Sequence, residues 1–342
     1  MTSYKEAGVD VEAKEKAIEE IKASVKETFT EDVLSAATTF KFGGTISLKR
    51  LMGYKEPVLV LSTDGVGTKM IIAEKMKRFG TVGVDILNHS INDVLTSGAK
   101  AMFFLDYIAS SRLDVKAVKE IVAGIAKECK RHGIVLAGGE TAEMPGVYHD
   151  GMHELTGTVG GVVERENIID GTRIKEGDVL LGLASSGLHT NGYSLARKIF
   201  FEDNNYSCDD KIEELGTTLG NALLATHREY ATPVLPLVEK KLVNGIVHIT
   251  GGGFPGNMPR VMPKGLGARV KLGSWDVLPI FKLMQKLGNV GDEEMLRTFN
   301  MGIGLVLVVS RENAAEVKKM INEEVYEIGD VVAGEGVQYE GS

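Results

Sequence analysis

The chain has 342 residues, enough for two domains with separate cores. Its hydrophobic content of 43% and charged content of 25% are those of a globular protein in water. The net charge of −8 argues against a general nucleic-acid binder, which needs a basic surface. The two cysteines have no metal-ligand spacing, and neither a signal core nor a membrane-spanning run is visible. We therefore expect a soluble, cytoplasmic protein that binds neither nucleic acid nor membrane.

The N-terminal half mixes helix and strand patterns. Residues 11–28 show the apolar spacing of an amphipathic helix, and 82–97 and 114–132 are further helical segments. The apolar runs 57–62 and 101–108 predict buried strands, as do 133–137 and 153–164.

A charged, turn-rich segment at 164–178 separates the two halves. We place the domain boundary there, with one domain at 1–170 and a second at 171–342. In the second half, the predicted strands are 179–184, 245–249, 268–272 and 303–309. The predicted helices are 193–201, 230–242 and 314–324. Helices and strands mixed in this way in each half predict an α+β protein of two mixed α/β domains.

The stretch Gly138-Gly139-Glu140-Thr141-Ala142-Glu143-Met144-Pro145-Gly146 is read as a loop after the strand 133–137. Glycines let main-chain N–H groups approach a ligand closely, and carboxylates there suit a divalent cation bound to phosphate. The alternative is a connecting loop in which Gly and Pro serve only for turning.

A second polar segment, Asp64-Gly65-Val66-Gly67-Thr68-Lys69, follows the strand 57–62. Its glycines can direct N–H groups to a phosphate, Lys69 adds positive charge, and Asp64 can hold Mg²⁺. The spacing differs from that of a Walker A loop, and a plain strand-to-helix turn is an equal alternative.

Oxygen donors also occur in the segment 82–97, where Asp85, His89 and Asn92 share one helical face and Asp93 follows. Such a face suits Mg²⁺, although for His89 we favour an ordinary solvated position. Asp106 interrupts the apolar strand 101–108, and a carboxylate there costs free energy unless it is paired or metal-bound. This favours a functional role for Asp106.

Three Gly-rich loops of the second half adjoin apolar strands, at 185–194, 250–256 and 297–304. In the first, His189 could act as a general acid or base, donate a hydrogen bond, or be a surface residue beside a helix cap. In the third, Arg297 could bind phosphate or form an ordinary salt bridge. So many polar loops in both halves favour two phosphorylated ligands.

Taken in order, these segments resemble phosphoribosylformylglycinamidine cyclo-ligase, the AIR synthetase family of purine biosynthesis. The resemblance runs from 3–10 to 328–329, nearly the whole chain. It includes DGVGTK at 64–69, Asn92-Asp93, FFLDY at 103–107, GGETAEMPG at 138–146, SSGLHTNGYSL at 185–195, TGGGF at 250–254 and RTFN at 297–300.

The resemblance implies a homodimer whose N-terminal sheets pair in a barrel-like interface, with ATP bound nearby and helices covering the C-terminal sheet. It also implies that formylglycinamidine ribonucleotide and ATP react to give aminoimidazole ribonucleotide, ADP and phosphate. ATP phosphorylates the formyl (amide) oxygen, and a substrate nitrogen then closes the ring. Such chemistry depends on positioning and on charge neutralisation by Mg²⁺, Lys and backbone N–H groups.

The loops and the resemblance together predict the site residues. The predicted catalytic residues are Lys69, Asp106, Glu140 and His189. The predicted ATP-binding residues are Asp64, Gly65, Gly67, Thr68, Asn92, Asp93, Gly138, Gly139 and Thr141. The residues predicted to bind the ribonucleotide substrate are Glu143, Ser186, Asn191, Gly192, Gly252 and Arg297. The predicted Mg²⁺ ligands are Asp64, Asp93 and Asp106. We expect 138–146 and 185–193 to face each other across the domain junction, with His189 positioning substrate rather than acting as a nucleophile.

Two departures from the family pattern put local contacts in question. The glycine-rich stretch before the first core strand is reduced to Phe42-Gly43-Gly44, and Pro-Thr-Arg reads Thr226-His227-Arg228. The alternatives are thiamine-monophosphate kinase, the formylglycinamidine synthetase, and an inactive nucleotide-binding scaffold. Selenophosphate synthetase is disfavoured because the N-terminal segment has no cysteine.

Overall fold

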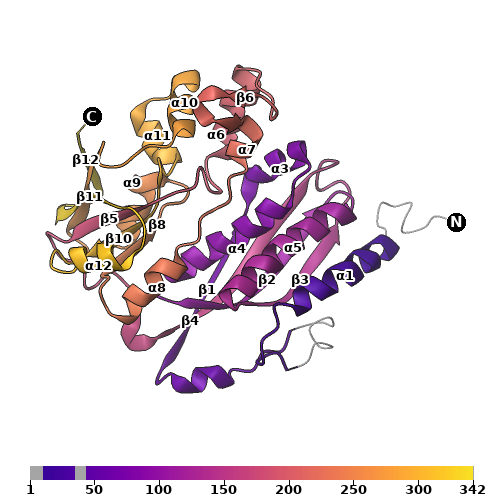
Figure 1. Cartoon of the computed structure of the whole chain (residues 1–342), viewed down its shortest axis with the longest axis horizontal. Coiled ribbons are helices and arrows are strands. Elements are labelled where there is room, and N and C mark those ends of the chain that lie inside the picture. Colours follow the sequence, from indigo (N-terminus) through magenta and orange to yellow (C-terminus); the bar gives the residue numbers. More distant parts are fainter. Residues whose placement is uncertain (1–10, 35–43, 342) are drawn as a thin grey trace. The chain divides into compact units, whose positions relative to one another are not determined.

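The computed structural model describes residues 11–34 and 44–341, which form two compact units (Figure 1). The segments of unit 1 are Met1–Val94 and Ala101–Glu164, and those of unit 2 are Leu95–Lys100 and Arg165–Ser342. Residues 3–10 and Phe42-Gly43, which carry parts of the family resemblance, lie outside the described residues.

Unit 1 is a four-stranded sheet with helices on one face (Figure 1). Its elements are α1 (Val11–Lys26), η1 (Lys49–Gly53), β1 (Pro57–Gly65), η2 (Gly67–Lys69), α3 (Met70–Met76), α4 (Gly80–Leu95), β2 (Lys100–Ser110), α5 (Val115–His132), β3 (Val135–Glu143) and β4 (His153–Glu164). The strand order is β1-β4-β2-β3, with β1 antiparallel to β4 and β2 parallel to β3. The sheet is open, because β1 and β3 are its edges within the described residues.

Helices α4 and α5 cover the sheet, and their sequences explain why they form and meet. Helix α5 begins after Asp114, whose carboxylate accepts hydrogen bonds from two backbone N–H groups, and ends at Gly133 in the left-handed conformation with φ 65°. A Cβ atom on Gly83 of α4 would lie 2.1 Å from the carbonyl oxygen of Ile121 in α5. Glycine therefore permits the close approach that buries α4 against α5.

Unit 2 is built on a six-stranded sheet of order β12-β9-β11-β5-β10-β8, antiparallel except where β12 joins β9. Its strands are β5 (Val179–Ala184), β8 (Gly245–His248), β9 (Leu266–Lys271), β10 (Ile303–Val309), β11 (Val325–Ala333) and β12 (Val337–Glu340), with a separate pair β6 (Lys211–Ile212) and β7 (Thr217–Thr218). Its helices are η3 (Arg165–Asn167), α6 (Tyr193–Arg197), η4 (Lys198–Asp203), η5 (Glu213–Leu215), α7 (Leu219–Leu223), α8 (Ala231–Glu239), α9 (Gly253–Asn257), η6 (Met258–Arg260), α10 (Pro279–Gly288), α11 (Asp292–Thr298) and α12 (Ala314–Met320). Both units are therefore mixed α/β, as predicted.

One predicted loop is a strand. Residues 138–143 continue β3 to Glu143, paired in parallel with 105–110 of β2. The pairing satisfies the backbone groups that a loop would expose, and neither Gly138 nor Gly139 has a positive φ. The glycine at 139 serves close approach instead, since a Cβ there would lie 2.5 Å from Asp106 Oδ1. The Met144 N–H still donates to the Ser110 carbonyl of β2 at 2.8 Å, so the sheet pairing extends to the end of the predicted loop's first six residues and one beyond.

Candidate functional site

The segment predicted as a phosphate loop after β1 is divided between the strand and a helical turn. Asp64 and Gly65 are the last residues of β1, and Gly67–Lys69 form η2. The Lys69 side chain is completely buried, with its Nζ 2.7 Å from a carboxylate oxygen of Asp85 in α4, which is equally buried. Burial lowers the pKa of Lys69, against the opposing effect of the Asp85 charge. Lys69 therefore lies beneath the turn, and its direct contact with phosphate stays a prediction.

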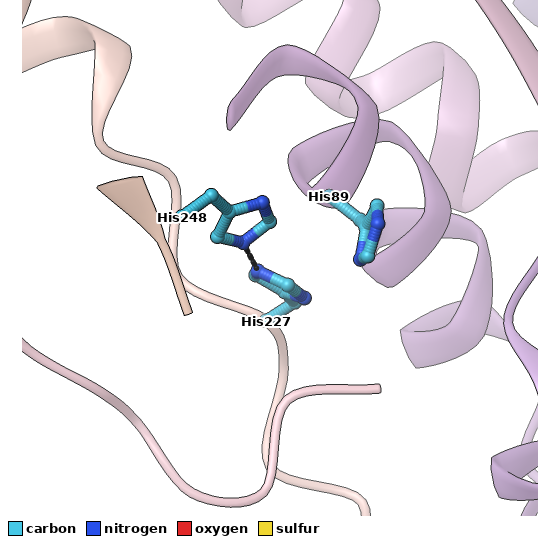
Figure 2. Close-up of side chains that lie close together, drawn as sticks. All are labelled: His89, His227 and His248. Carbon is cyan, nitrogen blue, oxygen red and sulfur yellow. Dashed lines mark hydrogen bonds between the residues drawn. The ribbon is translucent and has the colours of Figure 1, made fainter. Parts of the chain in front are cut away.

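Asp64, His89 and Asp93 form a compact group in unit 1. His89 Nε2 lies 2.8 Å from Asp64 Oδ2 and 3.5 Å from Asp93 Oδ2, and His89 projects from α4 (Figure 2). Ser62 donates a hydrogen bond to Asp93 Oδ2 at 3.0 Å, and Asp64 Oδ1 accepts one from the Gly65 N–H at 2.6 Å. Burial lowers the pKa of His89, but the hydrogen bonds and charges of the two carboxylates outweigh it and raise the pKa to about 9.

The interpretation of His89 as a solvated surface residue is wrong. The side chain is 2% exposed, and the helical face that it shares with Asp85 and Asn92 is buried. This group of Asp64, His89 and Asp93 offers two carboxylate oxygens and an imidazole nitrogen within 4.8 Å of one another. Two carboxylates at this spacing fit a small divalent cation.

The structure does not bring Asp106 into that group. Its carboxyl lies against Gly139 in the neighbouring strand, and burial raises its pKa to about 7. The role of Asp106 as a metal ligand stays a prediction. Glu140 is an exposed residue of β3. Glu143, at the end of that strand, accepts a hydrogen bond through Oε1 from the Leu113 N–H at 2.8 Å, which fixes the chain after β2.

A cavity of about 420 Å³ lies beside the end of β1. It is lined by Asp64, Gly65, Gly67, Thr68, Met70, Ile71, Met152, His153, Glu154 and Leu155. One part thus carries exposed backbone, a hydroxyl and a carboxylate, and another carries apolar side chains. Such a combination suits a ligand with a charged end and a flat apolar end.

In unit 2, the three predicted loops lie together, and the buried amide of Asn300 joins two of them. Ser185 Oγ donates to Asn300 Oδ1 at 2.9 Å, and the Gly302 N–H donates to the same oxygen at 2.9 Å. Asn300 Nδ2 donates in turn to the Gly187 carbonyl at 2.9 Å. The loop at 250–256 joins them, because Asn191 Oδ1 would lie 3.1 Å from a Cβ atom on Gly251. One amide therefore ties two loops together, and the third packs against them.

His189 is buried and not a surface residue. It is 1% exposed, and its backbone has φ 60°, a left-handed conformation that is uncommon outside glycine. The Ser186 N–H donates to His189 Nε2 at 3.2 Å. The His189 ring stacks on His227 with centroids 4.0 Å apart. His227 Nε2 lies 3.0 Å from His248 Nε2 (Figure 2).

The remaining predicted substrate residues lie around these loops. Ser186 donates a hydrogen bond to the Thr226 carbonyl, and Asn191 is partly buried. Gly192 and Gly252 adopt left-handed conformations with φ 79° and 96°, directly before α6 and α9. Arg297 is exposed on α11.

Family models match both halves of the chain. A model described as AIR synthase related protein, N-terminal domain, matches residues 50–163, and one described as AIR synthase related protein, C-terminal domain, matches residues 175–341. The chain belongs to the AIR synthase related family. This confirms the resemblance drawn from its motifs.

Named members of the family are similar over their whole length. A phosphoribosylformylglycinamidine cyclo-ligase from Thermoanaerobacter pseudethanolicus is 47% identical over 337 residues, which cover 98% of this chain and 98% of that protein. One of the same name from Lactobacillus acidophilus is 48% identical over 337 residues, with 97% of each chain covered.

Solved structures share the fold at low identity. Thiamine-monophosphate kinase from Stenotrophomonas maltophilia has a TM-score of 0.70 at 17% identity, covering 95% of this chain and 96% of that one. Hydrogenase maturation protein HypE in complex with ATP has a TM-score of 0.66 at 15% identity, covering 94% of this chain and 86% of that one. At such identities the likeness concerns the AIR synthase related fold alone. No helix in the described parts of the chain is long and apolar enough to cross a bilayer.

Sequence reasoning about this family member missed His227, His248 and the central position of Asn300. His248, like Asp106, is a polar residue within an apolar strand, and it also lies just before the Gly-rich turn at 250–256. The signal for Asn300 is weaker, since one amide among many loop residues gives no hint of its burial. The departure at Thr226-His227-Arg228 marked the region of His227 without indicating its contacts.

The buried Lys69–Asp85 pair generates a stability prediction. Asp85→Ala would leave an uncompensated ammonium in the core, so we expect the free energy of unfolding to fall by about 3–5 kcal/mol in chemical denaturation. The Lys198–Asp203 pair has the same N–O distance of 2.7 Å but exposed side chains, and Asp203→Ala should cost less than about 1 kcal/mol. Equal losses in the two variants would show that Lys69 does not depend on Asp85. The double variant Lys69→Met/Asp85→Leu should recover much of the lost stability.

Proposed function

We propose that this chain converts formylglycinamidine ribonucleotide and ATP to aminoimidazole ribonucleotide, ADP and phosphate. The supporting observation is identity of 47% to a phosphoribosylformylglycinamidine cyclo-ligase over 98% of both chains. The chain is thus an enzyme, an ATP-dependent cyclo-ligase of purine biosynthesis. ATP transfers its γ-phosphoryl group to the formyl oxygen, and a substrate nitrogen then attacks the activated carbon as phosphate leaves.

The cavity beside β1 is the proposed nucleotide site. Gly65, Gly67 and Thr68 offer backbone N–H groups and a hydroxyl to the phosphates, and the apolar part beside Met152 and Leu155 accepts the base. Asn92, Gly138 and Thr141 stay predicted nucleotide contacts. The donor set fits Mg²⁺, which Asp64 and Asp93 would hold. When bound, Mg²⁺ neutralises charge on the transferring phosphoryl group.

The residues of unit 1 then have distinct roles. Lys69 contributes a fixed positive charge beneath the turn that carries Gly67 and Thr68. Asp106, with a pKa of about 7, can exchange a proton near neutral pH, which suits removal of a proton from the attacking nitrogen. Glu140 is exposed on β3, paired with Tyr107 in the β2–β3 register, and is the second proposed acid–base group.

The residues of unit 2 are proposed to hold the ribonucleotide. His189 donates a hydrogen bond that orients the substrate, because a buried neutral ring offers a directed N–H without needing to titrate. Ser186, Asn191 and Gly192 lie on the same loop, Gly252 on the next, and Arg297 offers a positive charge for phosphate. No covalent intermediate with the protein is required.

The activity test is ADP release by the purified chain. Formylglycinamidine ribonucleotide should give one ADP per aminoimidazole ribonucleotide, whereas thiamine monophosphate and simple formamides should give none. Turnover of thiamine monophosphate instead would favour a kinase like the fold neighbour of that name.

Calorimetry tests the role of Asp64. Asp64→Asn should weaken Mg²⁺-ATP binding at least tenfold with little loss of stability, because it removes one charged ligand. Unchanged affinity in a folded variant would remove Asp64 from the nucleotide site.

A homodimer is proposed to cover the free face of the unit 1 sheet. Leu59 and Leu61 on β1 are 54% and 62% exposed, and Leu105 on β2 is 37% exposed.

The glycines of β4 show which face each phenylalanine of β2 occupies. Phe103 lies on the same face as these leucines, since a Cβ on Gly160 of β4 would clash with its ring. Phe104 points to the other face, which α4 covers, because both Phe104 and Ile86 would contact a Cβ on Gly157. An apolar sheet face of this kind suits the family's sheet-to-sheet dimer.

Light scattering tests this assembly. The chain should have about twice its subunit mass of 36.9 kDa at micromolar concentration. Leu61→Glu places a charge on the apolar face and should yield monomers. Met52→Glu changes a side chain that is 82% exposed outside the sheet and should leave the mass unchanged. A fully active protein of subunit mass would contradict the shared sheet.

A further inference from the structure

Three histidines form a buried imidazole row in unit 2. His189 and His227 are each 1% exposed, and His248 is 5% exposed. The His189 and His227 rings stack at 4.0 Å with an interplanar angle of 21°. The Nε2 atoms of His227 and His248 lie 3.0 Å apart (Figure 2). Thr190 Oγ1 lies 3.4 Å from the other ring nitrogen of His227. The row thus runs from a predicted substrate residue into the core.

Hydrogen bonding assigns the tautomer of His189. Because the Ser186 N–H donates to Nε2, that nitrogen carries a lone pair and the proton of the neutral ring is on Nδ1. The 3.0 Å contact between His227 and His248 likewise requires one Nε2–H and one lone pair. If His189 and His227 were both protonated, their two positive charges would lie about 4 Å apart, and the repulsion would cost several kcal/mol even at an effective dielectric of about 20. The row is therefore suited to a neutral His189.

The backbone at His189 does not by itself hold the ring in place. Its φ of 60° is a conformation in which a side chain other than glycine is strained. The surroundings hold it there: Tyr193 donates a hydrogen bond to the His189 carbonyl at 3.3 Å, and Gly304 packs against Cε1, where a Cβ would come within 2.5 Å. The broad face of the ring rests on His227.

We propose that His227 is a positioning residue for the cyclo-ligase reaction: by stacking it fixes the plane of His189, and so keeps Nε2 aligned with the Ser186 N–H that selects the tautomer. The inference rests on the proposed substrate role of His189. A residue needed only to fill this space would be cheaper if apolar, because a buried imidazole requires hydrogen-bond partners. His227 has one on each side, in His248 and Thr190. His248 holds His227, and His227 holds His189.

A double-mutant cycle tests the coupling. His227→Ala removes the stacked ring and should lower turnover roughly two- to tenfold, the range for a lost ring pair, with an unchanged KM for ATP. In a His189→Asn background, the same change should lower turnover no further, because there is no imidazole left to position. His227→Phe keeps a flat ring against His189 but loses the contacts to His248 and Thr190, so it should recover only part of the turnover. His149→Ala, at an exposed histidine of unit 1, is the control for loss of an imidazole.

Nitrogen NMR of the imidazoles gives a readout that a merely structural role would not move. The wild-type chain should show His189 as a single Nδ1–H tautomer, and His227→Ala should give a mixture while thermal denaturation confirms folding. A mixture already present in the wild-type chain would overturn the proposal even if His227→Ala failed to fold.

Kinetic outcomes separate this inference from the proposed function. Turnover losses that multiply in the double variant, or a Phe variant as slow as the Ala variant, would overturn positioning by His227. Wild-type turnover in His189→Asn would overturn it too, since nothing would then need positioning. In each case ADP release by the unaltered chain would still stand. Absence of ADP release with the ribonucleotide would overturn the proposed function itself.

Discussion

The buried ion pair between Lys69 and Asp85 is the constraint on which the candidate nucleotide site depends. Two fully buried charges are costly to desolvate, so the turn after β1 and helix α4 are stable only where the two groups meet. Asp85 lies one helical turn before His89 and two before Asp93. Fixing Asp85 at the end of β1 therefore also brings His89 and Asp93 to Asp64. The ion pair thus sets the position of the carboxylates, and Gly65 and Gly67 line the cavity beside them.

In unit 2, neutral hydrogen-bonding groups rather than an ion pair hold the loops in place. Asn300 accepts two hydrogen bonds and donates a third, which holds the loop at 185–187 to the start of β10. With that loop fixed, the chain can keep His189 at a positive φ, and the imidazole row fills the space behind it. An amide satisfied in this way is uncharged and needs no counter-charge in the loops that it holds.

Much of the fold follows from sequence because it depends on local periodicity. The strands 153–164, 179–184 and 303–309 were predicted with the observed bounds, and α5 within one residue, because apolar spacing and caps are local signals. The strand at 138–143 was predicted as a loop because its partner on β2 lies some 30 residues away and glycines usually mark turns. Strands β11 and β12 were missed for a similar reason: much of their stability comes from pairing with distant strands.

Side-chain partners were harder to predict than elements, since a polar residue on a helix has the same local pattern whether it faces water or the core. Lys69 and His89 show the consequence. Lys69 was predicted as a catalytic residue and its side chain is completely buried against Asp85, whereas His89 was predicted to be solvated and lies between two carboxylates. We propose that the two units serve different parts of one reaction. Unit 1 concentrates charges, which suits the triphosphate and its cation, whereas unit 2 buries neutral hydrogen-bonding rings, which suits orienting an uncharged amide. A ring closure driven by phosphorylation requires both, because the leaving group must be made before the nucleophile is aimed.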